Sequence, residues 1–249
     1  MAAAYYEAIA LLCRITPKGW YAERGTACAT VTGCAVASLN CACTTTLDPD
    51  LGVLDEMASE VGRLGVPWSI MVRGEAGDET TALAVRHGRV RRLDMPLMDC
   101  GPDEVRYRPV PARAASLRQV GGTESDLYTA GLTECFGAAE GVFGSLMRGA
   151  VLAAPEITGY VAEEAGRVVA TGLGMRTSGV VGVFNIGVAP AARGRGLGRA
   201  ITERVMLDGF EAGADRAYLH ASSMGRPLYE SMNFRLLETW TLFTAEPLR

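Results

Sequence analysis

The pattern of apolar and polar positions predicts a chain in which helices and strands alternate. Apolar residues at helical spacing predict a helix over residues 1–15, and small apolar residues over 27–46 predict two strands that turn near Gly33. The remainder of the first hundred residues predicts a helix over 50–64, a strand over 68–72, a helix over 79–87 and a strand over 90–98.

Residues 101–114 contain three prolines, several charges and few apolar residues, so they predict a linker. The residues that follow predict a strand over 117–120, helices over 124–136 and 139–147, strands over 157–163, 167–175 and 179–188, a helix over 193–213, a strand over 216–222, a helix over 225–232 and a strand over 235–244. We therefore expect an α/β fold (α+β, with a mixed central sheet) in two domains, residues 1–105 and 115–249.

Composition narrows the class of protein. Hydrophobic residues make up 49% of the chain and charged residues 21%, which is typical of a globular protein. The net charge of −4 argues against a dedicated nucleic-acid binder. The N-terminus has no basic segment and carries Glu7, unlike a signal peptide, and no apolar run reaches the roughly 20 residues of a membrane span. We expect a cytoplasmic protein.

The seven cysteines point to the same compartment. Their number is odd and their spacing matches no zinc pattern, so no metal site is expected. Several of them lie in apolar, strand-like segments. We expect free, buried thiols in a reducing environment.

Residues 180–201 carry the strongest chemical signal. An apolar strand ends near Pro190, a loop rich in glycine and arginine follows, and a helical pattern then begins at Leu197. Glycines let the backbone approach a ligand closely, and the first N–H groups of a helix have no partner within the helix. These groups, the helix dipole and three arginines together predict a site for a di- or triphosphate.

Other phosphate motifs that contain glycine do not fit this segment. A Walker P-loop needs Lys-Ser or Lys-Thr after its last glycine, and none follows. A Rossmann fingerprint beginning at Gly194 needs glycine where Arg199 stands. An RGG-type RNA segment would be repeated, whereas this motif occurs once, between a strand and a helix.

The order V-x-P-x-x-R-G-x-G-x-G, from Val188 to Gly198, resembles the acetyl-CoA motif of the GNAT superfamily of N-acetyltransferases. The predicted elements from residue 116 onward follow the GNAT order, so the resemblance covers the second half of the chain. It implies a GNAT fold and acetyl-CoA as the acyl donor. The residues expected to bind acetyl-CoA are Ile186, Gly187, Val188, Arg193, Gly194, Arg195, Gly196, Leu197, Gly198, Arg199 and Ser222.

The resemblance also implies how the acyl group is held. In GNAT domains the strand before the phosphate loop and the next strand splay apart, and the pantetheine arm lies between them. The backbone of Ile186, Gly187 and Val188 would pair with that arm, and an N–H there would stabilise the oxyanion formed when an amine attacks. Gly187 could mark a bulge or be a packing glycine.

Tyr229 lies in a segment, Leu228 to Phe234, that resembles the GNAT pattern Y-x-x-x-G-F. In that family the tyrosine protonates the departing CoA thiolate. Because a thiol titrates near 8.5 and a tyrosine near 10, a hydrogen bond to the thiolate is the safer role. Asn233 replaces the family's glycine, a mild change because asparagine tolerates a left-handed backbone. A purely structural core tyrosine is the alternative.

The base that deprotonates the acceptor is less well defined. Strand 180–188 has no carboxylate, although many family members place a glutamate there. His220 is one candidate because its pKa lies near neutrality, and a structural histidine is the alternative. Glu134 and Glu140 are weaker candidates, and a water relay without a single base is equally compatible. Further residues, Cys135, Phe136 and Phe143, would serve either packing or the acceptor pocket.

The first half of the chain repeats the order of elements that ends the second half. At the position of the phosphate loop it has Asp48 and Asp50 in place of the arginines, and these carboxylates would repel phosphate. It therefore resembles the degenerate N-terminal copy of tandem GNAT proteins. An unrelated N-terminal domain is the alternative.

The function predicted from the sequence is an acetyl-CoA-dependent N-acetyltransferase. It would act on a small-molecule amine by direct attack in a ternary complex, with no nucleic-acid or membrane partner. A non-catalytic acyl-CoA-binding or scaffolding protein is the alternative.

Overall fold

The computed structural model describes residues 1–108 and 115–246, and the first of these ranges folds nearly as its sequence predicts. Its elements are α1 (Ala2–Ile15), β1 (Trp20–Arg24), β2 (Ala27–Val31), β3 (Asn40–Thr44), α2 (Leu51–Gly62), β4 (Ser69–Val72), α3 (Asp78–Arg86) and β5 (Arg91–Cys100). Strand β1 was not predicted. It is a partly exposed edge strand without clear alternation of buried and exposed residues.

The second half follows the predicted order with one exception. Its elements are β6 (Ser116–Val120), α4 (Ser125–Phe136), α5 (Gly149–Leu152), β7 (Ile157–Glu164), β8 (Arg167–Thr177), β9 (Val180–Val188), α6 (Leu197–Glu211), β10 (Ala217–His220), α7 (Arg226–Ser231) and β11 (Arg235–Thr244). The helix predicted over 139–147 is wrong, because these residues form turns. Gly137 and Gly141 adopt left-handed backbones, with φ of 59° and 82°, which interrupt a helix.

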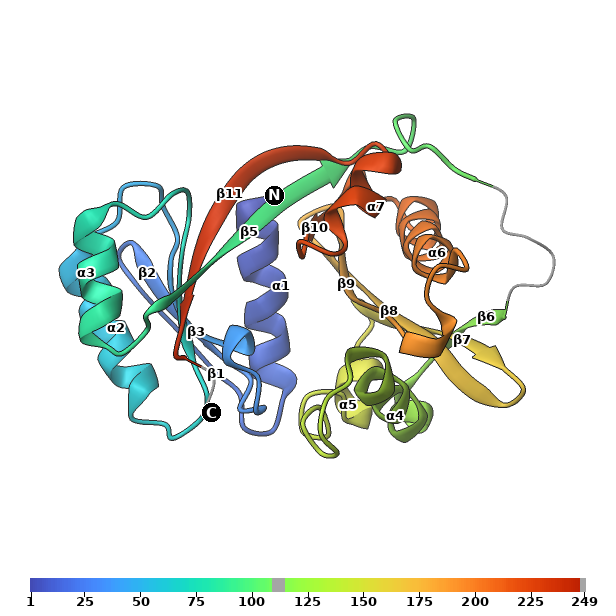
Figure 1. The fold of residues 1–249 in the computed structure, drawn as a ribbon, viewed down its shortest axis with the longest axis horizontal. Coiled ribbons are helices and arrows are strands. Elements are labelled where there is room, and N and C mark those ends of the chain that lie inside the picture. The colour runs from blue at the N-terminus through green and yellow to red at the C-terminus, as the bar shows by residue number, and fades with distance from the viewer. Residues whose placement is uncertain (109–114, 247–249) are drawn as a thin grey trace.

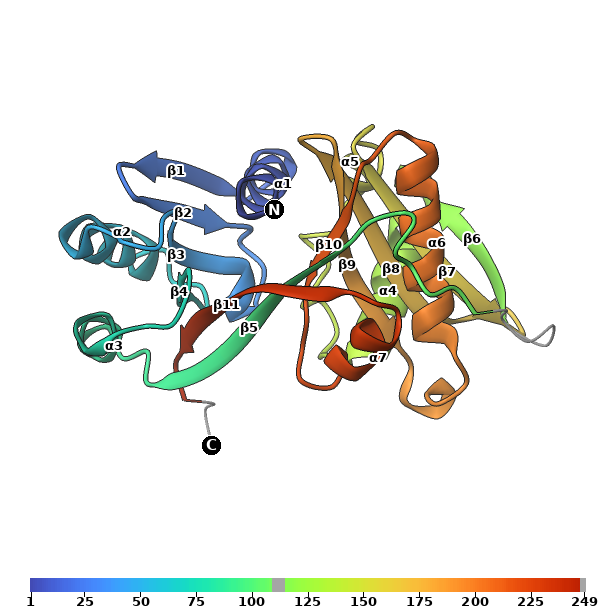
Figure 2. The ribbon, with the colours of Figure 1, turned by 90° about the horizontal axis from the view of Figure 1, so that it is seen from above.

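The eleven strands of the described residues form one mixed sheet in the order β1-β2-β3-β4-β11-β5-β10-β9-β8-β7-β6 (Figures 1 and 2). The strands on the two sides of this sheet pair in the same sequence of antiparallel and parallel directions. On the first side β2 and β3 are antiparallel and β3 and β4 are parallel. On the second side β8 and β9 are antiparallel and β9 and β10 are parallel. The two halves therefore share one topology about the centre of the sheet.

The last strand of each half is inserted into the other half. Strand β5 pairs with β10, from Ala217↔Cys100 to His220↔Leu97, and β11 pairs with β4. The two exchanged strands also pair with each other along most of their length (Figure 1). Part of the predicted linker, residues 109–114, lies outside the described residues. The halves are therefore joined through the sheet as well as through the chain between them.

Helices cover both faces of the sheet. In the second half α6 covers the face opposite α4 and α5, and in the first half α2 and α3 lie on the outer side (Figure 1). Helix α1 lies between the halves and contacts β1 and β2 as well as β8 and β9. The seven cysteines are free and buried, as predicted. No helix in the described ranges combines the length and the apolar character needed to cross a bilayer.

An aromatic cluster fixes α1 against the exchanged strand β11. Trp240 is completely buried, and its ring lies 5.3 Å from that of Tyr6 in a stacked arrangement and 5.2 Å from that of Tyr5 edge-on. The hydroxyl of Tyr6 donates to the carbonyl of Thr44 at 2.6 Å. This cluster joins the N-terminal helix to the C-terminal strand, so it couples the two ends of the chain.

We expect Trp240→Ala to destabilise the whole molecule by about 3–5 kcal/mol, the usual cost of removing a large buried aromatic side chain. Urea unfolding followed by far-UV circular dichroism should give one transition at a lower urea concentration. Leu237→Ala, on the same strand where the side chain is 49% exposed, is the control and should leave the midpoint nearly unchanged. Two separate transitions in the Trp240 variant would contradict this coupling.

Candidate functional site

Strands β9 and β10 separate soon after they meet. They pair only at Ala217↔Val181 and Tyr218↔Gly182. Beyond Gly182 no other strand among the described residues pairs with this edge of β9. The structure thus contains the splayed pair of strands that the resemblance implied.

The backbone of Val188 faces the opening. The N–H of the next residue, Ala189, donates to Val169 of β8 at 2.9 Å. Because backbone groups of successive residues point to opposite edges of a strand, the N–H and C=O of Val188 point away from β8. The Nε of Arg193 donates to this C=O at 3.1 Å, which leaves the Val188 N–H as a donor beside the opening.

A cavity of about 570 Å³ occupies this opening and extends to the start of α6. All of the residues expected to bind acetyl-CoA line it except Arg195, and Tyr229 lines it whereas His220 does not. The lining residues are Arg108, Cys135, Phe136, Ile186, Gly187, Val188, Ala192, Arg193, Gly194, Gly196, Leu197, Gly198, Arg199, Ser222, Met224, Gly225, Leu228, Tyr229 and Ser231. The sequence motif and the splayed strands therefore meet in one cavity.

The start of α6 is open to this cavity. Its N-cap is Gly196, with φ of 84°, and no side chain caps the helix. Gly194 is also left-handed, with φ of 75°, and the space where a Cβ would lie is empty at both glycines. The first N–H groups of α6 are therefore available to an anion, and the helix dipole adds to their attraction.

The arginines of the motif have different roles. Arg193 lines the cavity, whereas the exposed Arg195 forms an ion pair with Glu164. Arg199 is buried and donates to the carbonyl of Arg106 at 3.0 Å, to Glu203 and to the hydroxyl of Ser231. Its guanidinium therefore holds α6 against neighbouring segments, a role that the sequence motif alone did not indicate.

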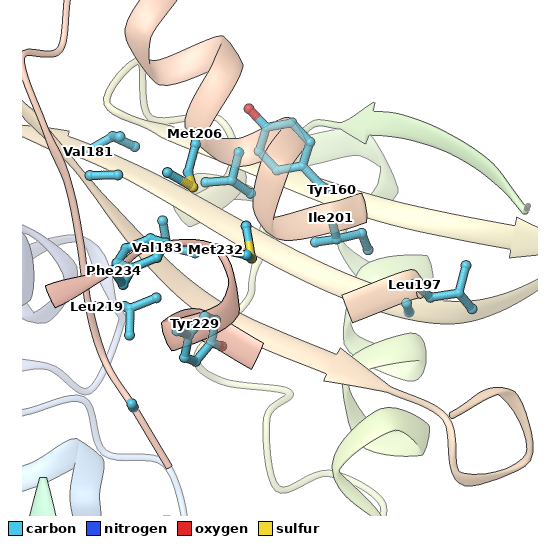
Figure 3. Close-up of a cluster of buried hydrophobic side chains, with 14 of the residues drawn as sticks. Tyr160, Val181, Val183, Leu197, Ile201, Met206, Leu219, Tyr229, Met232 and Phe234 are labelled. Carbon is cyan, nitrogen blue, oxygen red and sulfur yellow. The ribbon is translucent and has the colours of Figure 1, made fainter. Parts of the chain in front are cut away.

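Tyr229 lies at the inner end of the cavity. It is buried within the apolar cluster shown in Figure 3, and its ring lies 5.7 Å from that of Phe234. Burial raises the pKa of its hydroxyl to about 12, so this group keeps its proton at neutral pH. Asn233 has φ of 75°, the left-handed backbone expected for it.

His220 lies outside the cavity, among the aromatic side chains between the halves. Its ring lies 4.7 Å from that of Tyr5 and 4.6 Å from that of Trp240, both edge-on. Its Nε2 is buried without a hydrogen-bond partner in the described part of the chain, and burial lowers its pKa to about 3. This position does not support His220 as the base.

The other candidate bases do not line the cavity either. Glu134 and Glu140 line a separate hollow of about 770 Å³ beside α4. No Asp or Glu is among the described residues that line the cofactor-sized cavity. Cys135 and the half-exposed Phe136 line it instead. A Cβ on Gly187 would lie 2.8 Å from Cys135 and 2.7 Å from Phe136, so glycine is needed there for close packing.

Sequence reasoning missed several lining residues. Arg108 belongs to the predicted linker, and Met224 and Gly225 belong to the loop between β10 and α7. None of them falls in a recognisable motif. Their approach to the cavity depends on how distant segments fold back, which local sequence does not specify.

In the first half, the first N–H groups of the equivalent helix, α2, are already bound by a side chain. Asp50 is the N-cap of α2, and its Oδ1 accepts the N–H groups of Gly52 at 2.8 Å and Val53 at 3.2 Å. The chain itself therefore supplies the negative charge that a phosphate would supply at α6.

Comparisons with known proteins agree with this geometry. Residues 155–236 match the family model described as "Acetyltransferase (GNAT) domain". The fold is similar to that of a GCN5-related N-acetyltransferase from Kribbella flavida, with a TM-score of 0.69 and 18% identity over 99% of this chain and 95% of that chain. It is also similar to a GCN5-related N-acetyltransferase from Sphaerobacter thermophilus, with a TM-score of 0.60 and 19% identity over 93% and 80% of the two chains.

A third similar structure is a GCN5-related N-acetyltransferase-like protein from Streptococcus suis, with a TM-score of 0.59 and 11% identity over 97% of this chain and 99% of that chain. At these identities the likeness shows a shared fold, which extends over nearly the whole chain. No curated protein matches.

The environment of His220 gives a testable dependence of stability on pH. The unfolded chain binds a proton at this imidazole below its ordinary pKa of about 6.5, whereas the folded chain binds it only near pH 3. The contribution of the neutral His220 to the free energy of unfolding is therefore complete above pH 6.5. It is lost as the pH falls toward 3, with a slope of about 1.4 kcal/mol per pH unit.

We expect urea unfolding at pH 7, 6 and 5 to show a shallower loss of stability for His220→Phe than for the wild type. Phenylalanine fits the aromatic surroundings and removes an unpartnered buried nitrogen. Leu237→Phe, an aromatic substitution at an exposed position that carries no titratable group, is the control and should keep the wild-type slope. Equal slopes for the wild type and His220→Phe would contradict the assignment.

Proposed function

Because residues 155–236 match a family model of GNAT acetyltransferase domains, we propose that the protein transfers an acetyl group from acetyl-CoA to a small-molecule amine. Acetyl-CoA is the acyl donor of GNAT acetyltransferases. In the proposed reaction the amine attacks the thioester directly while both substrates are bound, and no acyl-enzyme forms.

The observation that carries this proposal is the uncapped start of α6 at the end of the splayed strands. The pyrophosphate of acetyl-CoA fits the free N–H groups that follow Gly196, with Arg193 beside them. The pantetheine arm fits along the open edge of β9. The thioester then lies near the inner end of the cavity, beside Val188 and Tyr229.

Two groups of this chain would assist the chemistry. The Val188 N–H would donate to the thioester oxygen and stabilise the negative charge that develops on it. The protonated hydroxyl of Tyr229 would donate to the departing sulfur. A new carbon–nitrogen bond forms, the carbon–sulfur bond breaks, and the proton lost by the amine balances the thiolate.

We also propose that the first half is a degenerate copy of the GNAT domain that no longer binds acetyl-CoA. The matching pairing patterns on the two sides of the sheet support a common origin. The Asp50 carboxylate at the start of α2 removes the donors that a phosphate would need. This half would instead complete the sheet and enclose the acceptor side.

We expect isothermal titration with acetyl-CoA to give one site per chain. Gly196→Val should weaken binding by at least about tenfold, because a side chain strains a backbone with φ of 84° and projects into the phosphate position. The control is Gly213→Val, which places the same residue at φ of 91° just beyond the other end of α6. Two sites per chain would contradict the closed first half, and no binding would contradict the proposed function.

We expect Tyr229→Phe to lower kcat by about 10²-fold or more, the usual effect of losing a proton donor, while the Kd for acetyl-CoA changes little. Turnover is followed by release of the CoA thiol with a panel of amines. Because the pKa of Tyr229 is about 12, its deprotonation should produce no alkaline loss of activity below about pH 11.

The alternative function, a non-catalytic acyl-CoA-binding or scaffolding protein, predicts a different result in the same assay. It predicts acetyl-CoA binding without thiol release for any amine, and identical behaviour of the wild type and Tyr229→Phe. That result would replace the enzymatic proposal with the binding one.

A further inference from the structure

The segment that follows β5, residues 101–108, crosses α6 (Figure 2), and we call it the strap. Its backbone is bonded to both helices that border the cavity. The N–H of Arg106 donates to the carbonyl of Met232 at the end of α7 at 3.1 Å. The N–H of Arg108 donates to Oε1 of Glu203 in α6 at 3.1 Å. The strap is therefore fixed to the second half up to Arg108.

Side chains of the second half hold the strap before this point. The Nδ2 of Asn233 donates to the carbonyl of Glu104 at 2.9 Å, and the guanidinium of Arg216 donates to its carboxylate at 2.8 Å. The buried Arg199 donates to the carbonyl of Arg106 at 3.0 Å. The path of the chain toward Arg108 is thus set by a series of hydrogen bonds.

This use of Arg199 changes which positive charges can meet a ligand. Arg199 is buried, and its guanidinium is bonded to the strap and to Glu203. Arg195 forms its ion pair with Glu164. Of the three arginines in the motif, Arg193 therefore remains to interact with a bound anion, because it lines the cavity and pairs with no carboxylate in residues 1–108 and 115–246.

Arg108 supplies a second positive charge from outside the motif. It lines the same cavity, and its side chain is exposed, so its guanidinium can turn toward a ligand. Glu203, which anchors its backbone, lies about 10 Å along α6 from the N-cap Gly196. Arg108 is thus held beside the cavity, but beyond the helix start to which the pyrophosphate is assigned.

Acetyl-CoA has two separate groups of negative charge. One is the pyrophosphate, which the uncapped start of α6 and Arg193 would bind. The other is the phosphate on the 3′-oxygen of the ribose, a monoester that carries close to two negative charges at pH 7. The planar guanidinium of arginine matches the oxygens of such a phosphate in a bidentate contact.

We propose that Arg108 binds the 3′-phosphate of acetyl-CoA, so that the segment joining the two halves forms part of the cofactor site. This inference rests on the proposed acetyltransferase function and assigns it a further cofactor-binding residue. The contact is remote from the thioester. Arg108 therefore contributes to the affinity for the cofactor and not to the chemical step.

Isothermal titration with acetyl-CoA and with acetyl-3′-dephospho-CoA, which lacks this phosphate, tests the assignment. We expect the wild type to bind acetyl-CoA at least about tenfold more tightly. Arg108→Gln should weaken acetyl-CoA about tenfold, the usual loss for one hydrogen-bonded charge pair, and change the Kd for the dephospho form less than about twofold. Because the strap is held through the backbone N–H of Arg108, the substitution keeps that bond.

Arg63→Gln is the matched control. It removes the same charge from an exposed position at the end of α2 in the first half, so it should keep both dissociation constants within about twofold of wild type. Arg108→Lys retains the charge but not the bidentate geometry, and it should weaken acetyl-CoA by about threefold. In steady-state assays Arg108→Gln should raise the KM for acetyl-CoA and leave kcat unchanged.

Three results would overturn the assignment while leaving the acetyltransferase function intact. They are an equal loss of affinity for the two cofactors in Arg108→Gln, no loss for either, or the same loss in Arg63→Gln, which would indicate net charge alone. A wild type that binds both cofactors equally well would also overturn it. Failure of the wild type to bind acetyl-CoA would instead overturn the proposed function, and this inference with it.

Discussion

The pairing of β5 with β10 is the constraint on which the cavity depends. Strand β10 has only two residue pairs with β9. Its other edge pairs with β5 from Ala217↔Cys100 to His220↔Leu97, which keeps β10 in the sheet while it diverges from β9. Strand β5 belongs to the first half of the chain. The first half thus helps to form the opening, and β11 fills the equivalent place beside β4 in return.

Two helices at equivalent positions, α2 and α6, differ in how their first N–H groups are satisfied. At α2 the carboxylate of Asp50 accepts two N–H groups, which stabilises the helix by about 1 kcal/mol and uses the donors. At α6 the N-cap is Gly196, which has no side chain to accept them. Helix α6 therefore lacks a side-chain cap, and its first N–H groups remain available. Binding of a ligand would recover that stabilisation, so affinity here depends on the absence of a side chain as much as on the nearby arginines.

Local sequence predicted most elements and the glycine-rich start of α6 because apolar periodicity and glycine placement determine local geometry. It failed where that information is weak. Residues 139–147 have apolar positions at helical spacing, but left-handed glycines at 137 and 141 interrupt them. The exchange of β5 and β11 could not be predicted, because ladder hydrogen bonds join backbone groups that every residue carries. The same limit applies to His220 and Arg199. Each has a residue type suited to chemistry, and in each case distant segments determine its surroundings.

No carboxylate lines the cavity within the described part of the chain, which places a demand on the proposed reaction. An alkylamine with a pKa near 10.4 costs about 4.6 kcal/mol to deprotonate at pH 7. His220 does not line the cavity, so in the proposed reaction a water relay or desolvation of the bound amine must supply much of that energy. Low polarity disfavours charge on every group it surrounds, and the same effect keeps Tyr229 protonated. It also disfavours the departing thiolate, which is why that sulfur needs the tyrosine hydroxyl. A dry site therefore makes the amine a better nucleophile only if it also contains a proton donor for the leaving group.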